Sequence, residues 1–99
     1  MKTSEKIRQR LKEKEVRFHS NDNIADYIEK GEIEELQKEV EDSFSGVLDA
    51  LVIDTENDHN TKETARRVAK MYINEIFAGR FVNPPKVTSF PNMGYRSLY

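Results

Sequence analysis

The sequence predicts a mostly helical chain, and three observations lead to this fold class. Apolar residues recur at spacings of three or four over most of the chain, which is the period of an amphipathic helix. The positions between them are filled mainly by Glu, Lys, Arg and Gln, which favour helices. A strand is expected only near residues 87–90, because Pro84 and Pro85 impose an extended approach to it.

The composition limits both the size of the core and the classes of function. The 99 residues form one small domain or a piece of one, with 36% apolar and 34% charged residues. The net charge of −2 gives no bulk electrostatic reason to bind nucleic acid or a membrane, so we expect neither as a partner. The absence of cysteine excludes disulfides and thiolate-bound metal within these residues. No apolar run reaches about 18 residues and no signal peptide is present, so we expect a cytoplasmic protein.

Residues 1–31 are expected to begin with a helix from about Ser4 to Arg17. Its apolar stripe, formed by Ile7, Leu11 and Phe18, is narrow. We therefore expect this helix to lie on a surface or on a partner chain, with low intrinsic stability.

A polar turn at residues 19–23 then interrupts the helical pattern, because short polar side chains bond nearby backbone groups. Asn21 or Asn23 is expected to cap a short helix from Ile24 to Lys30, which Gly31 ends.

Residues 32–80 are expected to form an antiparallel hairpin of two helices around a connector at residues 54–60. The first helix, from about Glu32 to Ile53, carries the strongest apolar periodicity in the chain. The second is expected from Thr61 to Ala78, with an Asn60–Glu63 capping box before it and Gly79 as a left-handed stop. Its apolar face is expected to include Ala65, Val68, Ala69, Tyr72 and Ile76, with Ile73 and Phe77 beside them. Residues 81–99 are expected to be an extended segment leading into a sheet.

Metal-binding patterns are present but incomplete. Residues 54, 56, 58 and 60 alternate like the start of a calcium loop, but His59 replaces the required glycine and Ala65 stands where the bidentate glutamate belongs. A solvated connector is the better interpretation. His19 and His59 have no second ligand at helical spacing, so we expect hydrogen-bonding loop histidines and no zinc site.

Positive charge is concentrated on the last predicted helix, at Lys62, Arg66, Arg67 and Lys70. A solvated helix face with intrahelical ion pairs is the ordinary interpretation. A nucleic-acid surface would need a wider basic area than this chain offers. A third interpretation is that one arginine binds a phosphate-bearing small ligand, because guanidinium binds phosphate in bidentate fashion.

The segments Thr64-Ala-Arg-Arg-Val-Ala-Lys-Met-Tyr72, Glu75-Ile-Phe-Ala-Gly79 and Pro85-Lys-Val-Thr88 resemble GTP cyclohydrolase I. In that family a Thr-Pro-x-Arg-[Val/Ile]-Ala-Lys-Met-Tyr helix ends in Phe-[Ser/Ala]-Gly and is followed by Pro-Lys-[Val/Ile]-Thr. The resemblance extends over about residues 47–92, and residues 17–24 more weakly resemble phage-type members. One departure is Ala65, where the family usually has proline at a first-turn position.

The resemblance implies a zinc-dependent hydrolase of pterin and tetrahydrofolate biosynthesis. Zinc-activated water opens the imidazole ring of GTP, formate leaves, and 7,8-dihydroneopterin triphosphate forms. It also implies an α+β tunnelling fold, with helices outside an antiparallel barrel of strands, assembled as a homodecamer. Arg67 matches a family position associated with the triphosphate and is the one site residue that the resemblance assigns in this chain.

The family's zinc-binding Cys and His-His do not occur within the 99 residues. We therefore expect the chain to be the N-terminal portion of such an enzyme, which supplies scaffold and subunit contacts and has no turnover alone. Whether the natural chain continues past Tyr99 is left open by the sequence. The alternative is a free-standing helical interaction or regulatory module without catalysis.

Overall fold

The computed structural model describes residues 1–83, and this part of the chain is helical. It consists of α1 (Thr3–Glu13), a 3-10 turn (Ala25–Tyr27), α2 (Glu32–Ala50), α3 (Thr64–Met71), a π-helical turn (Tyr72–Ile76) and α4 (Ala78–Phe81). No strand occurs within residues 1–83, so the mostly helical class is confirmed there. The strand expected near 87–90, and most of the extended segment expected at 81–99, lie outside the described residues.

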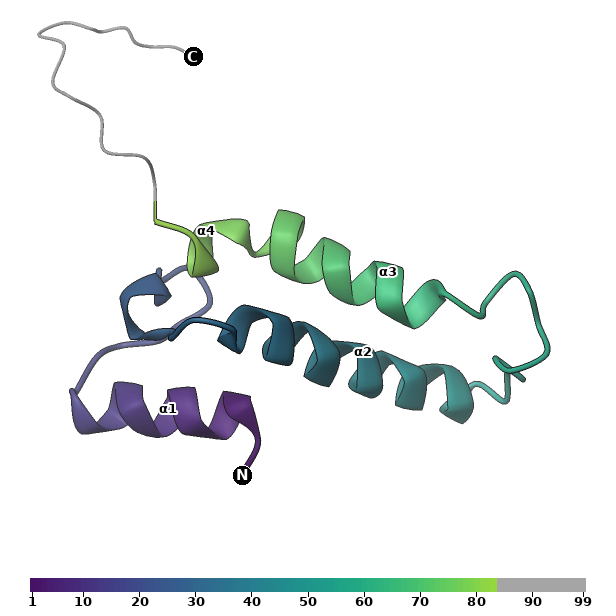
Figure 1. The fold of residues 1–99 in the computed structure, drawn as a ribbon, viewed down its shortest axis with the longest axis horizontal. Coiled ribbons are helices and arrows are strands. Elements are labelled where there is room, and N and C mark those ends of the chain that lie inside the picture. The colour runs from purple at the N-terminus through teal and green to yellow at the C-terminus, as the bar shows by residue number, and fades with distance from the viewer. Residues whose placement is uncertain (84–99) are drawn as a thin grey trace, which may run out of the picture.

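The helices lie side by side around α2. Helices α2 and α3 run antiparallel as a long hairpin joined at one end, and α1 packs against the first half of α2 (Figure 1). The short α4 lies at the end of the hairpin opposite the connector, close to the loop that follows α1 (Figure 1). Within residues 1–83, no helix is long and apolar enough to cross a membrane.

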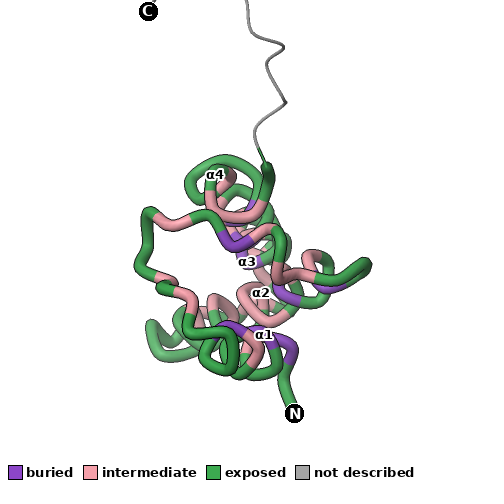
Figure 2. Tube along the Cα trace, turned by 90° about the vertical axis from the view of Figure 1, so that its left-hand side faces the viewer, coloured by how far each residue is buried: buried purple, intermediate pink, exposed green. Residues whose placement is uncertain are grey.

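The core lies where α1, α2 and the π turn meet, and it is small. It contains the buried side chains of Ile7, Leu11, Ile24, Leu36 and Ile73, with Leu11 only 1% exposed. Figure 2 shows the buried residues on the sides of the helices that face one another. The narrow stripe of α1 packs on α2 of the same chain and most of its other residues are exposed, which agrees with the expected surface position. Contact of this helix with a partner chain stays a prediction.

Hydrogen bonds from the start of α1 to α2 reinforce this packing. The backbone N–H and the hydroxyl of Ser4 both donate to the Glu39 carboxylate, at 2.8 and 2.6 Å. The hydroxyl of Thr3 donates to Glu35. A carboxylate at a helix N-terminus satisfies free N–H groups and interacts favourably with the helix dipole. The orientation of α1 on α2 is thus fixed by polar contacts as well as by apolar burial.

Helices α1 and α2 both end earlier than expected, at Glu13 instead of Arg17 and at Ala50 instead of Ile53. Two residues after each helix stands a residue in the left-handed region, Glu15 at φ 54° and Val52 at φ 63°. The N–H of the following residue bonds back to the helix, from Val16 to Leu11 and from Ile53 to Leu48. These are Schellman-type ends, and the sequence did not reveal them because neither uses glycine.

The segment between α1 and α2 is less helical than expected. The helix predicted from Ile24 to Lys30 is reduced to the 3-10 turn, although the side chain of Asn23 does accept the N–H of Ala25 at 2.8 Å. Gly31, at φ 86°, does not end that turn but stands immediately before α2 as its N-cap residue. Gly31 therefore adopts its left-handed conformation at the start of a helix, whereas we expected it at the end of one.

The last predicted helix, Thr61 to Ala78, is divided. Helix α3 begins only at Thr64, its N-cap residue Glu63 makes no side-chain cap, and the predicted Asn60–Glu63 capping box does not form. The N–H of Phe77 bonds to the carbonyl of Tyr72, five residues back, which inserts an extra residue into that turn. Gly79 lies inside α4, not in a left-handed stop.

The extra residue also changes which side chains are buried. Ala65, Ala69 and Ile73 form a buried line at spacings of four, whereas Ile76 is 53% exposed. The expectation that Ile76 belongs to the apolar face was wrong, because the π turn rotates the residues after it relative to α3.

Candidate functional site

The basic residues of α3 border an open cleft of about 340 Å³ at the connector end of the hairpin. Glu63, Arg66, Arg67 and Lys70 line it from one side of the helix, because residues three and four apart share a helix face. His59 lines the same cleft from the connector that precedes α3. The structure thus places Arg67, the site residue expected from the sequence, in an exposed position among other charged side chains.

The cations of this cleft differ in their partners. Arg66 pairs with Glu63 at 3.2 Å, and both side chains are mostly exposed. Among residues 1–83, the side chains of Arg67 and Lys70 have no hydrogen bond or ion pair. Their charges are therefore available to an anion, and a guanidinium such as that of Arg67 can bind two phosphate oxygens at once.

The described residues do not form a metal site. Within residues 1–83, no group of three or more His, Asp or Glu side chains is placed to hold a metal ion. The two histidines lie at different ends of the hairpin, since His19 is held against α4 and His59 precedes α3. The donor set in the described part of the chain therefore does not fit the zinc that the family resemblance implies.

A second polar cluster, which the sequence analysis missed, joins the loop after α1 to α4. The guanidinium of Arg80 donates to three backbone carbonyls, those of Phe18, His19 and Asp22, at 2.5–3.1 Å. The Asn23 amide donates to the carbonyls of Gly79 and Val82, at 2.8 and 2.9 Å. No spacing in the sequence indicates these contacts, because they join residues about sixty positions apart. They fix the position of α4 relative to the loop.

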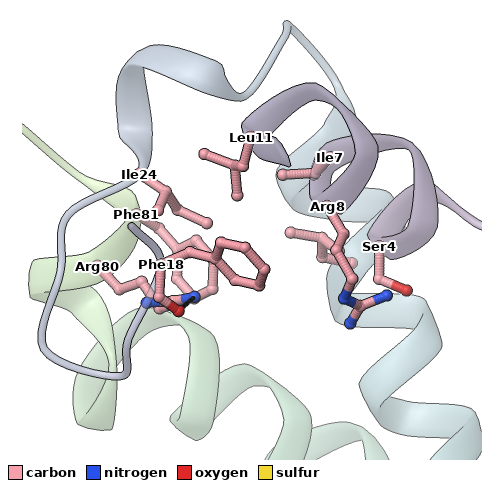
Figure 3. Close-up of a pocket in the computed structure, with 9 residues that line it drawn as sticks. Ser4, Ile7, Arg8, Leu11, Phe18, Ile24, Arg80 and Phe81 are labelled. Carbon is pink, nitrogen blue, oxygen red and sulfur yellow. Dashed lines mark hydrogen bonds between the residues drawn. The ribbon is translucent and has the colours of Figure 1, made fainter. Parts of the chain in front are cut away.

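Two apolar hollows lie beside this cluster. The smaller, of about 150 Å³, is lined by apolar side chains with Ser4 and Arg8 at one side and Arg80 at the other (Figure 3). The larger, of about 440 Å³, lies between α2 and the π turn. Phe18, Arg80 and Phe81 line both. The described part of the chain thus leaves apolar surface open next to the point where it ends at residue 83.

Ion pairs in this part of the molecule shift carboxyl pKa values. The Arg10 guanidinium binds Glu32 through two hydrogen bonds of 2.8 and 3.0 Å, which lower the pKa of Glu32 below its usual range. Arg17 forms a similar pair with Asp22, and its hydrogen bond lowers the pKa of Asp22 to about 2. Both carboxyls are therefore ionised at neutral pH and serve the structure, not proton transfer.

Comparison with known proteins identifies relatives for part of the chain. It is 38% identical over 60 residues to the GTP cyclohydrolase 1 of Aliivibrio salmonicida and to that of Vibrio vulnificus. It is 38% identical over 67 residues to the GTP cyclohydrolase 1 of Shewanella baltica. These matches cover 60% and 66% of this chain.

The chain spans less than a third of the length of these curated relatives, 27% and 31%. No family model matches the chain, and no solved structure matches it. Over the matched residues the chain is similar to GTP cyclohydrolase 1, which confirms the family resemblance that its motifs predicted.

Proposed function

We propose that this chain is the N-terminal helical part of a GTP cyclohydrolase I-like enzyme. The complete enzyme would hydrolyse the imidazole ring of GTP, giving formate and 7,8-dihydroneopterin triphosphate for pterin and tetrahydrofolate synthesis in the cytoplasm. The observation that carries this proposal is the 38% identity to GTP cyclohydrolase 1 over 60 residues. A helical module without catalysis, the alternative, is not favoured by that similarity.

Within this enzyme we assign Arg67 to the triphosphate of GTP. Its side chain is exposed on α3 and has no hydrogen-bond or ion-pair partner within residues 1–83, while the neighbouring Arg66 is occupied by Glu63. A triphosphate presents several anionic oxygens, and a guanidinium matches two of them in one plane. The role of Arg67 in this proposal is to bind and orient substrate, not to break bonds.

We assign the remaining helices to scaffold and subunit contacts in a homo-oligomer, with a decamer as the form that the family resemblance implies. Large apolar side chains are exposed at the connector end of α2, including Val47, Leu51 and Val52. Ile76, at the end of the π turn, and Val82, after α4, are also exposed. Such residues usually become buried against further protein. We therefore also propose that the tunnelling fold, with a barrel of strands, completes this helical part.

Zinc would activate the attacking water in the complete enzyme. The described residues provide no set of ligands for it, and the sequence contains no cysteine. We therefore propose that its ligands lie outside this chain, and we expect no turnover from the 99 residues alone. Formate release from GTP by the isolated chain with zinc would contradict this expectation.

A chimera tests the proposal. The matching segment of the Aliivibrio salmonicida GTP cyclohydrolase 1 is replaced by that of this chain, and formate release from GTP is measured. We expect activity, and we expect Arg67→Gln in the chimera to lower kcat/KM about tenfold to a hundredfold, the effect of losing a charged hydrogen-bond pair.

Arg66→Gln is the matched control. It removes the same charge at the neighbouring position, but the Arg66 side chain is already paired with Glu63. It should lower kcat/KM less than Arg67→Gln does, because the Arg66 guanidinium is already paired. Equal losses in the two variants would contradict the assignment of Arg67. A chimera that assembles but has no activity would contradict the proposed function itself.

A further inference from the structure

We propose that His59 is an additional, pH-dependent cation of the cleft that contains Arg67, and that it strengthens the binding of polyphosphate anions when it is protonated. This inference rests on the proposed function, because it takes the same cleft to be the triphosphate site. It adds a residue from the connector, which neither the motif resemblance nor the helix pattern assigned to the site.

The position of His59 relative to the cleft is the first support. Four of the five lining side chains come from Glu63 and the first two turns of α3, and His59 alone reaches the cleft from the connector. An anion in the cleft would therefore meet cations from two segments of the chain. A group on a second side of the anion can contact oxygens that a single helix face does not reach.

The charge of the lining is the second support. Arg66, Arg67 and Lys70 are permanent cations and Glu63 is a carboxylate, so the lining carries a net charge of +2, which becomes +3 when His59 is protonated. Asp58, which precedes His59, is the neighbouring charged group in the connector. Protonation of the imidazole therefore adds one positive charge to the lining.

The order of the connector around His59 is the third support. The carbonyl of Asp58 accepts the N–H groups of Thr61 and Lys62, at 3.1 and 3.0 Å, and its carboxylate accepts the N–H of Asn60 at 3.0 Å. Asp58 therefore holds the residues on the C-terminal side of His59 in a turn. Because the backbone is already ordered, recruiting the imidazole costs little conformational entropy.

Binding of inorganic tripolyphosphate to the 99-residue chain, followed by NMR at about pH 5.5 and about pH 7.5, tests this inference. The variants are His59→Gln and Arg67→Gln. The matched control is His19→Gln, because His19 lies in the loop held by Arg80 and does not line the cleft. Phosphate itself takes up a proton near pH 6. The decisive comparison is therefore between variants at the same pH, not between pH values.

At the lower pH we expect wild type and His19→Gln to bind about threefold to tenfold more tightly than His59→Gln, as one additional screened charge predicts. At the higher pH the three proteins should bind equally. The imidazole signals of His59, and not those of His19, should shift during the titration.

Two outcomes would overturn the inference, and they differ in what else they contradict. If His59→Gln binds like wild type at both pH values while Arg67→Gln binds more weakly, His59 has no role but the proposed phosphate site stands. If wild type shows no tripolyphosphate binding at the cleft residues at either pH, the inference and the assignment of Arg67 both fail. The side chains of His59 and Arg67 are exposed, so neither substitution should unfold the protein.

Discussion

The contacts of Arg10 join three segments of the chain next to the core. Its guanidinium binds the carboxylate of Glu32 at the start of α2 and donates to the carbonyl of Tyr27 at 2.6 Å. The side chains of Arg10 and Glu32 are only 23% and 9% exposed. Glu32 also accepts the N–H of Glu29, at 2.7 Å. This pair therefore holds α1, the 3-10 turn and α2 together, and removing one partner would leave the other poorly satisfied.

We predict that Glu32→Gln lowers the free energy of unfolding by about 1–3 kcal/mol at neutral pH. The folded-state pKa of Glu32 is lowered, chiefly by the Arg10 hydrogen bond. Its contribution is therefore present above the ordinary carboxyl pKa, and it is lost as the pH falls through the lower folded value. Urea unfolding at several pH values should show the difference between wild type and variant shrinking below about pH 4.

Glu34→Gln is the control for this prediction, because Glu34 is exposed on the same helix. It should change the free energy of unfolding by less than about 0.5 kcal/mol. A difference between wild type and Glu32→Gln that stays constant from neutral to acid pH would contradict the role given to the ion pair. Asp22, whose pKa is lowered to about 2 by Arg17, should add acid sensitivity to both proteins equally.

At the scale of the elements, α1 and α2 are terminated by residues that do not usually terminate helices. Glu15 and Val52 adopt the left-handed conformation, which is unfavourable for residues with a Cβ and most unfavourable for β-branched ones. Val52 is 92% exposed, so no packing compensates this cost at its own side chain. The turn is maintained by the backbone bonds of the Schellman-type end, from Val52 to Asp49 and from Ile53 to Leu48.

We predict that Val52→Gly raises the free energy of unfolding by about 0.5–1 kcal/mol. Glycine adopts positive φ without steric cost, and this gain exceeds its larger loss of backbone entropy on folding. Val47→Gly is the matched control, because Val47 lies inside α2 and is also exposed. It should destabilise the protein by about 0.5–1 kcal/mol. Thermal unfolding of both variants checks the prediction, and destabilisation by Val52→Gly would contradict it.

At the scale of the whole molecule, burial is unevenly distributed along the hairpin. The half that carries α1, the 3-10 turn and the π turn contains the core around Leu11, whereas the connector half leaves Val47, Leu51 and Val52 exposed. A chain of this size buries a small fraction of its surface compared with larger domains. Its stability should therefore depend on few side chains, among them Ile7 and Leu11 of α1, which are 3% and 1% exposed.

We predict that Leu11→Ala lowers the free energy of unfolding by about 2–5 kcal/mol, the cost of truncating a fully buried leucine. Because α1 is held to α2 largely by Ile7 and Leu11, hydrogen exchange in α1 should accelerate more than in α3. Val47→Ala, an exposed truncation on α2, should change stability by less than about 0.5 kcal/mol. Similar effects of the two substitutions would show that α1 is not docked as described.

Two features of the candidate site show how far the sequence alone could identify it. Arg67 was found because its motif matches a family position, and the helical spacing placed it with Arg66 and Lys70 on one face. The spacing could not show that Glu63 occupies Arg66, or that His59 lines the same cleft, because these depend on where the connector folds. Arg80 was missed entirely, since its partners are backbone carbonyls about sixty residues away.

The sequence by itself determined the helical class, the approximate position of each long helix and the resemblance to GTP cyclohydrolase I. These properties follow from the spacing of apolar residues and from the residue order of the motifs, which depend only on positions close together in the sequence. The tertiary structure alone decided where α1 and α2 end, that the helix expected from Ile24 to Lys30 is only a turn, and that a π turn divides the last helix. The helix ends depend on backbone bonds around non-glycine residues, as from Val16 to Leu11, which the side-chain pattern does not reveal. The turn after Ile24 is held by contacts with a distant segment, as from Ile24 to Arg80, which compete with local helix propensity.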